Sequence, residues 1–131
     1  MSGEPSPQAE TIRQEIKGII SRADGDGPTD VERLESRDGR ITYIGKSLGF
    51  AVGELMAVLS VSPQEWGYTV WHFPNNRAVG NPGRNMQILS LSDNSSITPG
   101  GPLTDSLTTI THDAPVIGSG STVIVFLRYN A

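Results

Sequence analysis

The sequence has no cysteine among its 131 residues. This absence excludes disulfide frameworks, thiolate zinc sites and iron–sulfur clusters, and it fits a reducing compartment. No apolar run approaches the roughly 18 residues that a membrane-spanning helix needs, and the first ten residues lack the basic and apolar regions of a secretory signal. We therefore expect a cytoplasmic or otherwise intracellular protein with no membrane partner, and the length predicts one domain over 1–131.

Charged residues are scarce in the second half of the chain. After residue 65 there are only three arginines and three aspartates, and no lysine follows Lys46. The net charge of −4 disfavours nonspecific nucleic-acid binding by bulk charge. A surface that is polar through Ser, Thr and Asn but poor in charge is typical of a protein interface. Small virion and phage proteins often share this composition, and the analogy is one of composition alone.

The clearest helix signal lies near the start of the chain. Ser6 and Pro7 supply a capping hydroxyl and a proline at the first helical position, which predicts a helix over 7–22. One side of that helix is apolar and the other is charged: Ile12, Ile16, Ile19 and Ile20 against Arg13, Glu15 and Lys17. Residues 1–6 are predicted to be a flexible terminus, and the main body is expected to span 40–131.

Two further helices are predicted before residue 60. One has a continuous apolar face made by Leu48, Ala51, Val52, Leu55, Met56 and Leu59. Gly49 and Gly53 lie within it, and each destabilises the helix by roughly 1 kcal/mol relative to alanine. We therefore expect that these glycines allow the helix to pack closely on a sheet. Thr29 and Glu32 resemble a capping box, which predicts a short helix over 31–34.

The remaining sequence alternates between β-prone segments and loops rich in Gly, Pro and Asn. Five strands are predicted, at 40–45, 68–73, 86–92, 107–111 and 121–129. The last is apolar on both faces, which predicts a central strand whose Val123, Val125 and Leu127 are buried near the helices. The fold class is therefore α+β, with mixed α/β as the alternative: two amphipathic helices on a mixed sheet of four or five strands, with a right-handed crossover joining 40–45 to 68–73.

Two histidines are the side chains that titrate near neutrality. His72 shares a strand face with Tyr68 and Val70, so it is interpreted either as a partly buried structural residue or as a general base. His112, next to Asp113, is the other candidate. If both met at one cleft, a histidine-based hydrolase or nuclease would be conceivable. The sequence has no nucleophile elbow, no phosphate-binding glycine loop and no metal-ligand spacing, so neither a metal nor another cofactor is expected.

The loop over 74–85 is the best candidate for ligand binding. Arg77, Asn81, Arg84 and Asn85 make it rich in hydrogen-bond donors, which would suit phosphate or an RNA backbone. The alternative is a turn-rich loop whose arginines are only solvated.

The threonine-rich segment over 107–111 bears on self-association. If it is an edge strand, it lacks the lysine or proline that normally protects such edges, and only Asp105 and Asp113 flank it. This predicts a homo-oligomer, a dimer or larger, whose contact draws on residues after 66. The first functional hypothesis is thus a non-enzymatic structural, assembly or interaction protein, such as a small virion-associated or phage component. The histidine hydrolase or nuclease and an RNA- or phosphate-binding module are the alternatives, with RNA or another protein as further partners.

Overall fold

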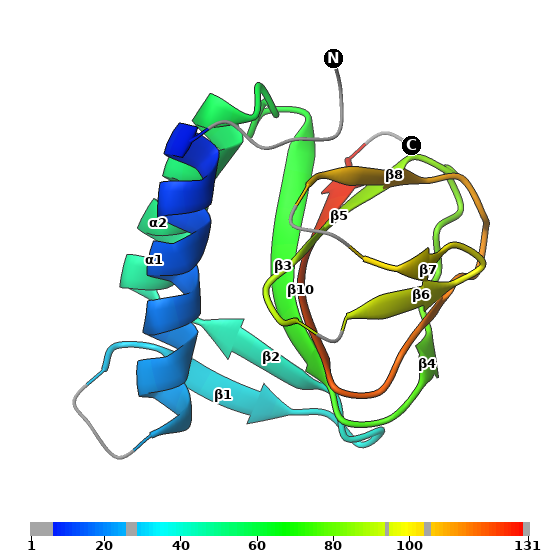
Figure 1. The fold of residues 1–131 in the computed structure, drawn as a ribbon, viewed down its shortest axis with the longest axis horizontal. Coiled ribbons are helices and arrows are strands. Elements are labelled where there is room, and N and C mark those ends of the chain that lie inside the picture. Colours follow the sequence, from blue (N-terminus) through cyan, green and yellow to red (C-terminus); the bar gives the residue numbers. More distant parts are fainter. Residues whose placement is uncertain (1–6, 26–28, 94, 104–105, 130–131) are drawn as a thin grey trace.

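The computed structural model describes residues 7–25, 29–93, 95–103 and 106–129. Figure 1 shows three layers: helices α1 (Pro7–Asp24) and α2 (Lys46–Val58) cover one face of a large sheet, and a smaller sheet lies against its other face. Both expected amphipathic helices are confirmed. The capping residue Ser6 and the expected flexible segment 1–6 lie outside the described residues.

The strands of the described residues form two antiparallel sheets. The larger has the order β1 (Glu32–Glu35), β2 (Ile41–Ile44), β3 (Trp66–Phe73), β10 (Ser121–Arg128), β5 (Met86–Ser90) and β8 (Thr108–Ile110). The smaller has the order β4 (Arg77–Ala78), β9 (Val116–Ile117), β6 (Ser96–Thr98) and β7 (Gly101–Pro102). All five expected strands are present, and β10 has the central place that its sequence predicted.

The expected mixed sheet of four or five strands is wrong. Within the described ranges, one sheet has six strands and a second has four, and every pairing is antiparallel. Because β2 and β3 pair antiparallel, no right-handed crossover joins them. The smaller sheet was missed because strands of two or three residues carry no readable periodicity.

The short helix expected over 31–34 is also wrong, since these residues belong to β1 and the turn before it. Thr29 Oγ1 accepts a hydrogen bond from Val31 N at 3.1 Å, so the threonine makes a local turn and not a helix cap. β1 then pairs with β2 in a hairpin whose turn contains Gly39 at φ +90°. All four β1 side chains are exposed, so burial of side chains does not explain why this segment is a strand. Backbone pairing with β2 explains it.

Each face of the large sheet has its own core. The helix-side core joins the helices to Val70, Ile124 and Phe126, and the second core, under the small sheet, contains Val123 and Val125. The expectation that Val123 and Val125 pack near the helices is therefore wrong, although both are fully buried. Leu127 is only half-buried. Neighbouring strand residues face opposite sides, so it is Ile124 and Phe126 that meet the helical layer.

Two helix residues depart from the predicted pattern. Arg13, assigned to the charged side, is only 7% exposed, because its Nε donates to Ser90 O at 2.8 Å. Gly53 is exposed, and no described residue outside its own stretch of helix comes within 4 Å of the place where a Cβ would stand, so close packing does not explain it. No helix of the described residues is long and apolar enough to cross a membrane.

Candidate functional site at the open edge of the large sheet

The two histidines lie on different parts of the large sheet. His72, on β3, has its Nδ1 2.8 Å from Thr122 Oγ1 on the adjacent β10. His112 follows β8, where its Nδ1 accepts from Ala114 N at 3.2 Å and lies 3.7 Å from Asp113 Oδ1. Since β10 and β5 separate β3 from β8, the two parent strands are three strand spacings apart, roughly 14 Å. The structure does not bring the histidines into one site.

The arginines of the 74–85 loop have separate surroundings. Arg77 Nη2 lies 3.0 Å from Asp38 Oδ2. A backbone hydrogen bond from Arg40, together with the charges of Arg77 and Arg40, holds the pKa of the Asp38 carboxyl below its usual value. Arg84 is exposed, in a turn closed by its own N–H on Asn81 O, and has no ion-pair partner in the described part of the chain. Arg77 is thus engaged in an ion pair, whereas Arg84 is solvated.

Asn81 is a buried structural residue that supports the edge strand β8. It is 1% exposed, and its Nδ2 donates to Ile110 O at 2.8 Å and to His112 O at 2.9 Å. Its Oδ1 accepts from Met86 N at 3.1 Å. Met86 and Ile110 are register partners across β5 and β8, so the Asn81 amide bridges this pair. Both amide protons are used, which leaves no side-chain donor for a ligand.

Asn85, the remaining candidate of this loop, is half-buried, and its side chain makes no hydrogen bond within the described ranges. Sequence reasoning could not separate Asn81 from Asn75, Asn76 or Asn85, because the four asparagines share one turn-rich segment.

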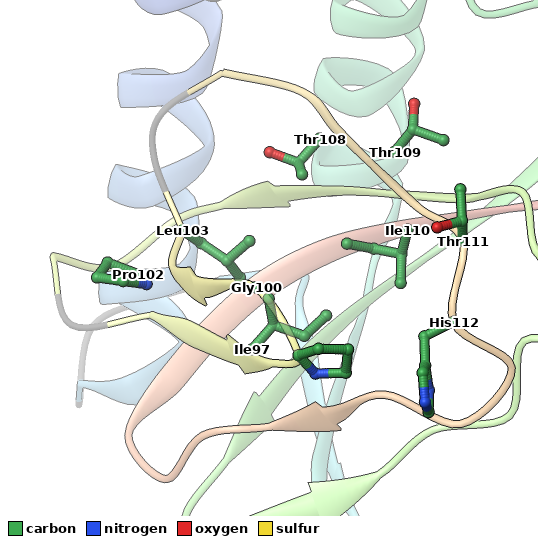
Figure 2. Close-up of a pocket in the computed structure, with 10 residues that line it drawn as sticks. Ile97, Gly100, Pro102, Leu103, Thr108, Thr109, Ile110, Thr111 and His112 are labelled. Atoms are coloured by element: carbon green, nitrogen blue, oxygen red, sulfur yellow. The ribbon is translucent and has the colours of Figure 1, made fainter.

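An apolar groove lies between β8 and the β6–β7 hairpin, where the edges of the two sheets meet (Figure 2). Its volume is about 300 Å³. Figure 2 shows Ile97, Leu103 and Ile110 around its middle, with His112 at one end. Ile97 and Ile110 belong to the second core, so the groove is a place where that core reaches the surface. A partner that covered it would bury apolar surface.

The direction of the backbone groups in β5 follows from one hydrogen bond. Leu91 N donates to Thr122 O at 2.7 Å, and this pair continues the β5–β10 register. Bonded pairs alternate along an antiparallel ladder. Residues two apart therefore share a direction: Met86, Ile88 and Ser90 direct their N–H and C=O groups away from β10, toward β8.

The same alternation fixes which groups of β8 are free. Thr108 and Ile110 stand opposite Ile88 and Met86 and are the bonded positions of β8. The N–H and C=O groups of Thr109 therefore point outward, away from the sheet. β8 is the last strand of the large sheet, and from Ser106 to Thr111 there is no charged side chain. Among the described residues, no strand pairs with the outer side of β8, and no charged side chain of Ser106–Thr111 would repel another strand there.

Comparisons of this chain with family models, curated proteins and solved structures give no match. Within the described residues, no group of three or more histidine, aspartate and glutamate side chains could hold a metal ion. The feature with the most definite chemistry is therefore the open edge, which we define as Thr108–Ile110 together with the adjoining groove.

Proposed function

We propose that this chain is a non-enzymatic assembly protein whose copies associate through the open edge. The observation that carries the proposal is the outward direction of the Thr109 backbone groups on an uncharged edge strand. Strands left in this state pair readily with another strand, and monomeric proteins normally block them with charge, proline or a covering segment. The apolar groove beside β8 adds surface that a partner would remove from water.

The occupant that we assign to the open edge is a second copy of the chain. A two-fold axis at Thr109 would set the two Thr109 residues opposite each other, so that they exchange two backbone hydrogen bonds. Thr108 would stand opposite Ile110 of the second copy. Within Thr108–Ile110 no like charges meet in this arrangement, because these three residues are uncharged. With the groove covered as well, the contact should reach the ~1,000 Å² that a specific interface needs.

Sedimentation velocity at micromolar concentrations tests the proposal with one substitution. Thr109→Pro removes only the outward N–H, since that group takes no part in the β5–β8 ladder, and proline is tolerated on edge strands. Thr109→Val is the matched control, because it changes the side chain but keeps the N–H. Thr109→Lys is a second way to block the edge, through charge. Circular dichroism verifies that each variant is folded.

We expect wild type and Thr109→Val to sediment as multiples of the 14.0 kDa chain, and Thr109→Pro and Thr109→Lys to sediment as smaller species. A wild-type protein that stays at 14.0 kDa throughout would overturn the proposal. So would folded Thr109→Pro and Thr109→Lys proteins that assemble as well as wild type.

A further inference from the structure

Strand β1 forms the opposite edge of the large sheet. We propose that β1 forms a second two-fold contact, with β1 of another copy, centred on Leu34. The inference extends the proposed assembly function to a different surface, and it is tested with the open edge blocked.

β1 is the outermost strand at its end of the sheet, and all four of its side chains are exposed. Leu34 is 46% exposed and Ile44, on β2, is 53% exposed. Tyr43 belongs to the helix-side core, so its neighbours Thr42 and Ile44 face away from the helices. Leu34 is the register partner of Thr42 and shares that face. The exposed apolar side chains of this hairpin thus lie on one surface.

The direction of the β1 backbone groups follows from the hairpin turn. Ser36 N donates to Arg40 O at 2.8 Å, and this pair continues the β1–β2 register. By alternation, Leu34 also directs its backbone groups toward β2. Arg33 and Glu35 are then the residues whose N–H and C=O groups point away from the sheet, toward a partner strand.

Only one register of a β1 pair satisfies both the hydrogen bonds and the charges. An axis at Leu34 sets Arg33 opposite Glu35 of the second copy, twice, so every outward group meets an outward group, and Arg33 and Glu35 each meet the opposite charge. An axis at Arg33 or at Glu35 would set like charges opposite each other, which is destabilising. An axis between two residues would set outward groups opposite inward ones.

The side chains fit the Leu34-centred register on both faces. Arg33 Nε already lies 2.8 Å from Asp24 Oδ1 of α1, whereas Glu35 has no ion-pair partner among the described residues. The second copy would supply Glu35 with an arginine and extend this pair into a charge network. On the other face, the two Leu34 side chains would stand opposite each other at a non-hydrogen-bonded position, where Cβ atoms come within about 5 Å.

The charge pattern identifies the occupant as a second copy. Charged residues usually keep strands off a sheet edge, but here Arg33 and Glu35 stand symmetrically about Leu34 with opposite signs. A foreign strand would need the same pattern by coincidence. A dimer formed through one edge of the sheet still has its other edge free in each copy. Two-fold contacts at both edges would therefore join copies into an open linear array.

Charge reversal in a Thr109→Pro background tests the β1 contact alone. Arg33→Glu and Glu35→Arg each turn two opposite-charge pairs into like-charge pairs, and each should weaken self-association at least ~10-fold. An equimolar mixture of the two variants restores both opposite-charge pairs and should associate. The double variant Arg33→Glu, Glu35→Arg should associate by itself. Glu32→Arg is the matched control, because Glu32 would face the uncharged Ser36 and should change the affinity by less than ~3-fold.

Sedimentation equilibrium up to about 500 µM suits a contact of this small size. Rescue on mixing, together with a weak effect of Glu32→Arg, supports the proposal. The proposal is overturned if the Thr109→Pro protein stays monomeric over the whole range, or if the mixture is no more associated than its components. The proposed contact through the open edge is tested separately: if it were wrong, Thr109→Pro would leave the assembly of the protein unchanged.

Discussion

Replacing Asn81 by alanine should destabilise the protein strongly, although the residue lies in a loop. The change removes three hydrogen bonds, to Ile110 O, His112 O and Met86 N. A hydrogen bond contributes about 1 kcal/mol net, and a buried partner left unsatisfied costs about 1–3 kcal/mol. Met86 is fully buried, so its N–H cannot turn to water. We therefore expect the free energy of unfolding to fall by about 3–5 kcal/mol, out of a total of about 5–15 kcal/mol for such a domain.

Urea denaturation followed by circular dichroism measures this loss. With a slope of about 1–3 kcal/mol per molar urea, the midpoint should fall by ~2 M. Asn85→Ala is the matched control, because Asn85 lies in the same loop without a side-chain hydrogen bond among the described residues. It should cost less than ~0.5 kcal/mol. If the Asn81→Ala loss were under ~1 kcal/mol and equal to that of Asn85→Ala, the Asn81 bridge between β5 and β8 would be refuted.

Three other predictions test the layers of the fold. In urea denaturation, Phe126→Ala should cost about 3–5 kcal/mol and Leu127→Ala less than ~2 kcal/mol, and equal losses would contradict the full burial of Phe126 beside the half-buried Leu127. Gly53→Ala should stabilise the protein by about 0.5–1 kcal/mol, since no other part of the described chain crowds the added Cβ; a lower melting temperature would show a contact there. Burial, with a hydrogen bond to Asp24, raises the pKa of Tyr43 to about 12. The ordinary tyrosine pKa is about 10, so the folded state holds the Tyr43 proton more tightly than the unfolded state does. The stabilisation that results is complete below pH ~10 and lost between pH ~10 and ~12. Tyr43→Phe should lose less stability over that window in alkaline denaturation, and identical pH profiles would contradict the shift.

The sequence predicted those helices and strands whose own residue pattern identifies them without reference to other segments. The isoleucines of α1 repeat at helical spacing, and β10 is apolar on both faces, so each could be located without knowing its neighbours. The threonines of 107–111 predicted a strand there, and the structure places it at the edge of the large sheet. The Asp38-Gly39 turn before the strand at 40–45 is a hairpin signal that points to β1, and it competes with the capping pattern of Thr29 and Glu32.

Other features depend on contacts between distant segments and leave no local pattern. Arg13 is buried because Ser90 O, 77 positions along the chain, accepts from its guanidinium. Among the loop asparagines, Asn81 is distinguished by its hydrogen bonds to the end of β8 and to Met86 N. Strands β4 and β9, of two residues each, form because β9 passes between β4 and β6. At the candidate site, composition indicated an uncharged surface. The direction of the Thr109 backbone groups could be derived only from the register of β10, β5 and β8.

Amide hydrogen exchange at Thr109 tests the central claim most directly. Thr108 and Ile110 should be protected at every protein concentration, because their N–H groups bond to β5. If copies associate through the open edge, exchange at Thr109 should be fast in dilute protein and should slow as the concentration rises and sedimentation detects assembly. Fast exchange at Thr109 in fully assembled protein would contradict the account, because it would show that the copies associate through another surface.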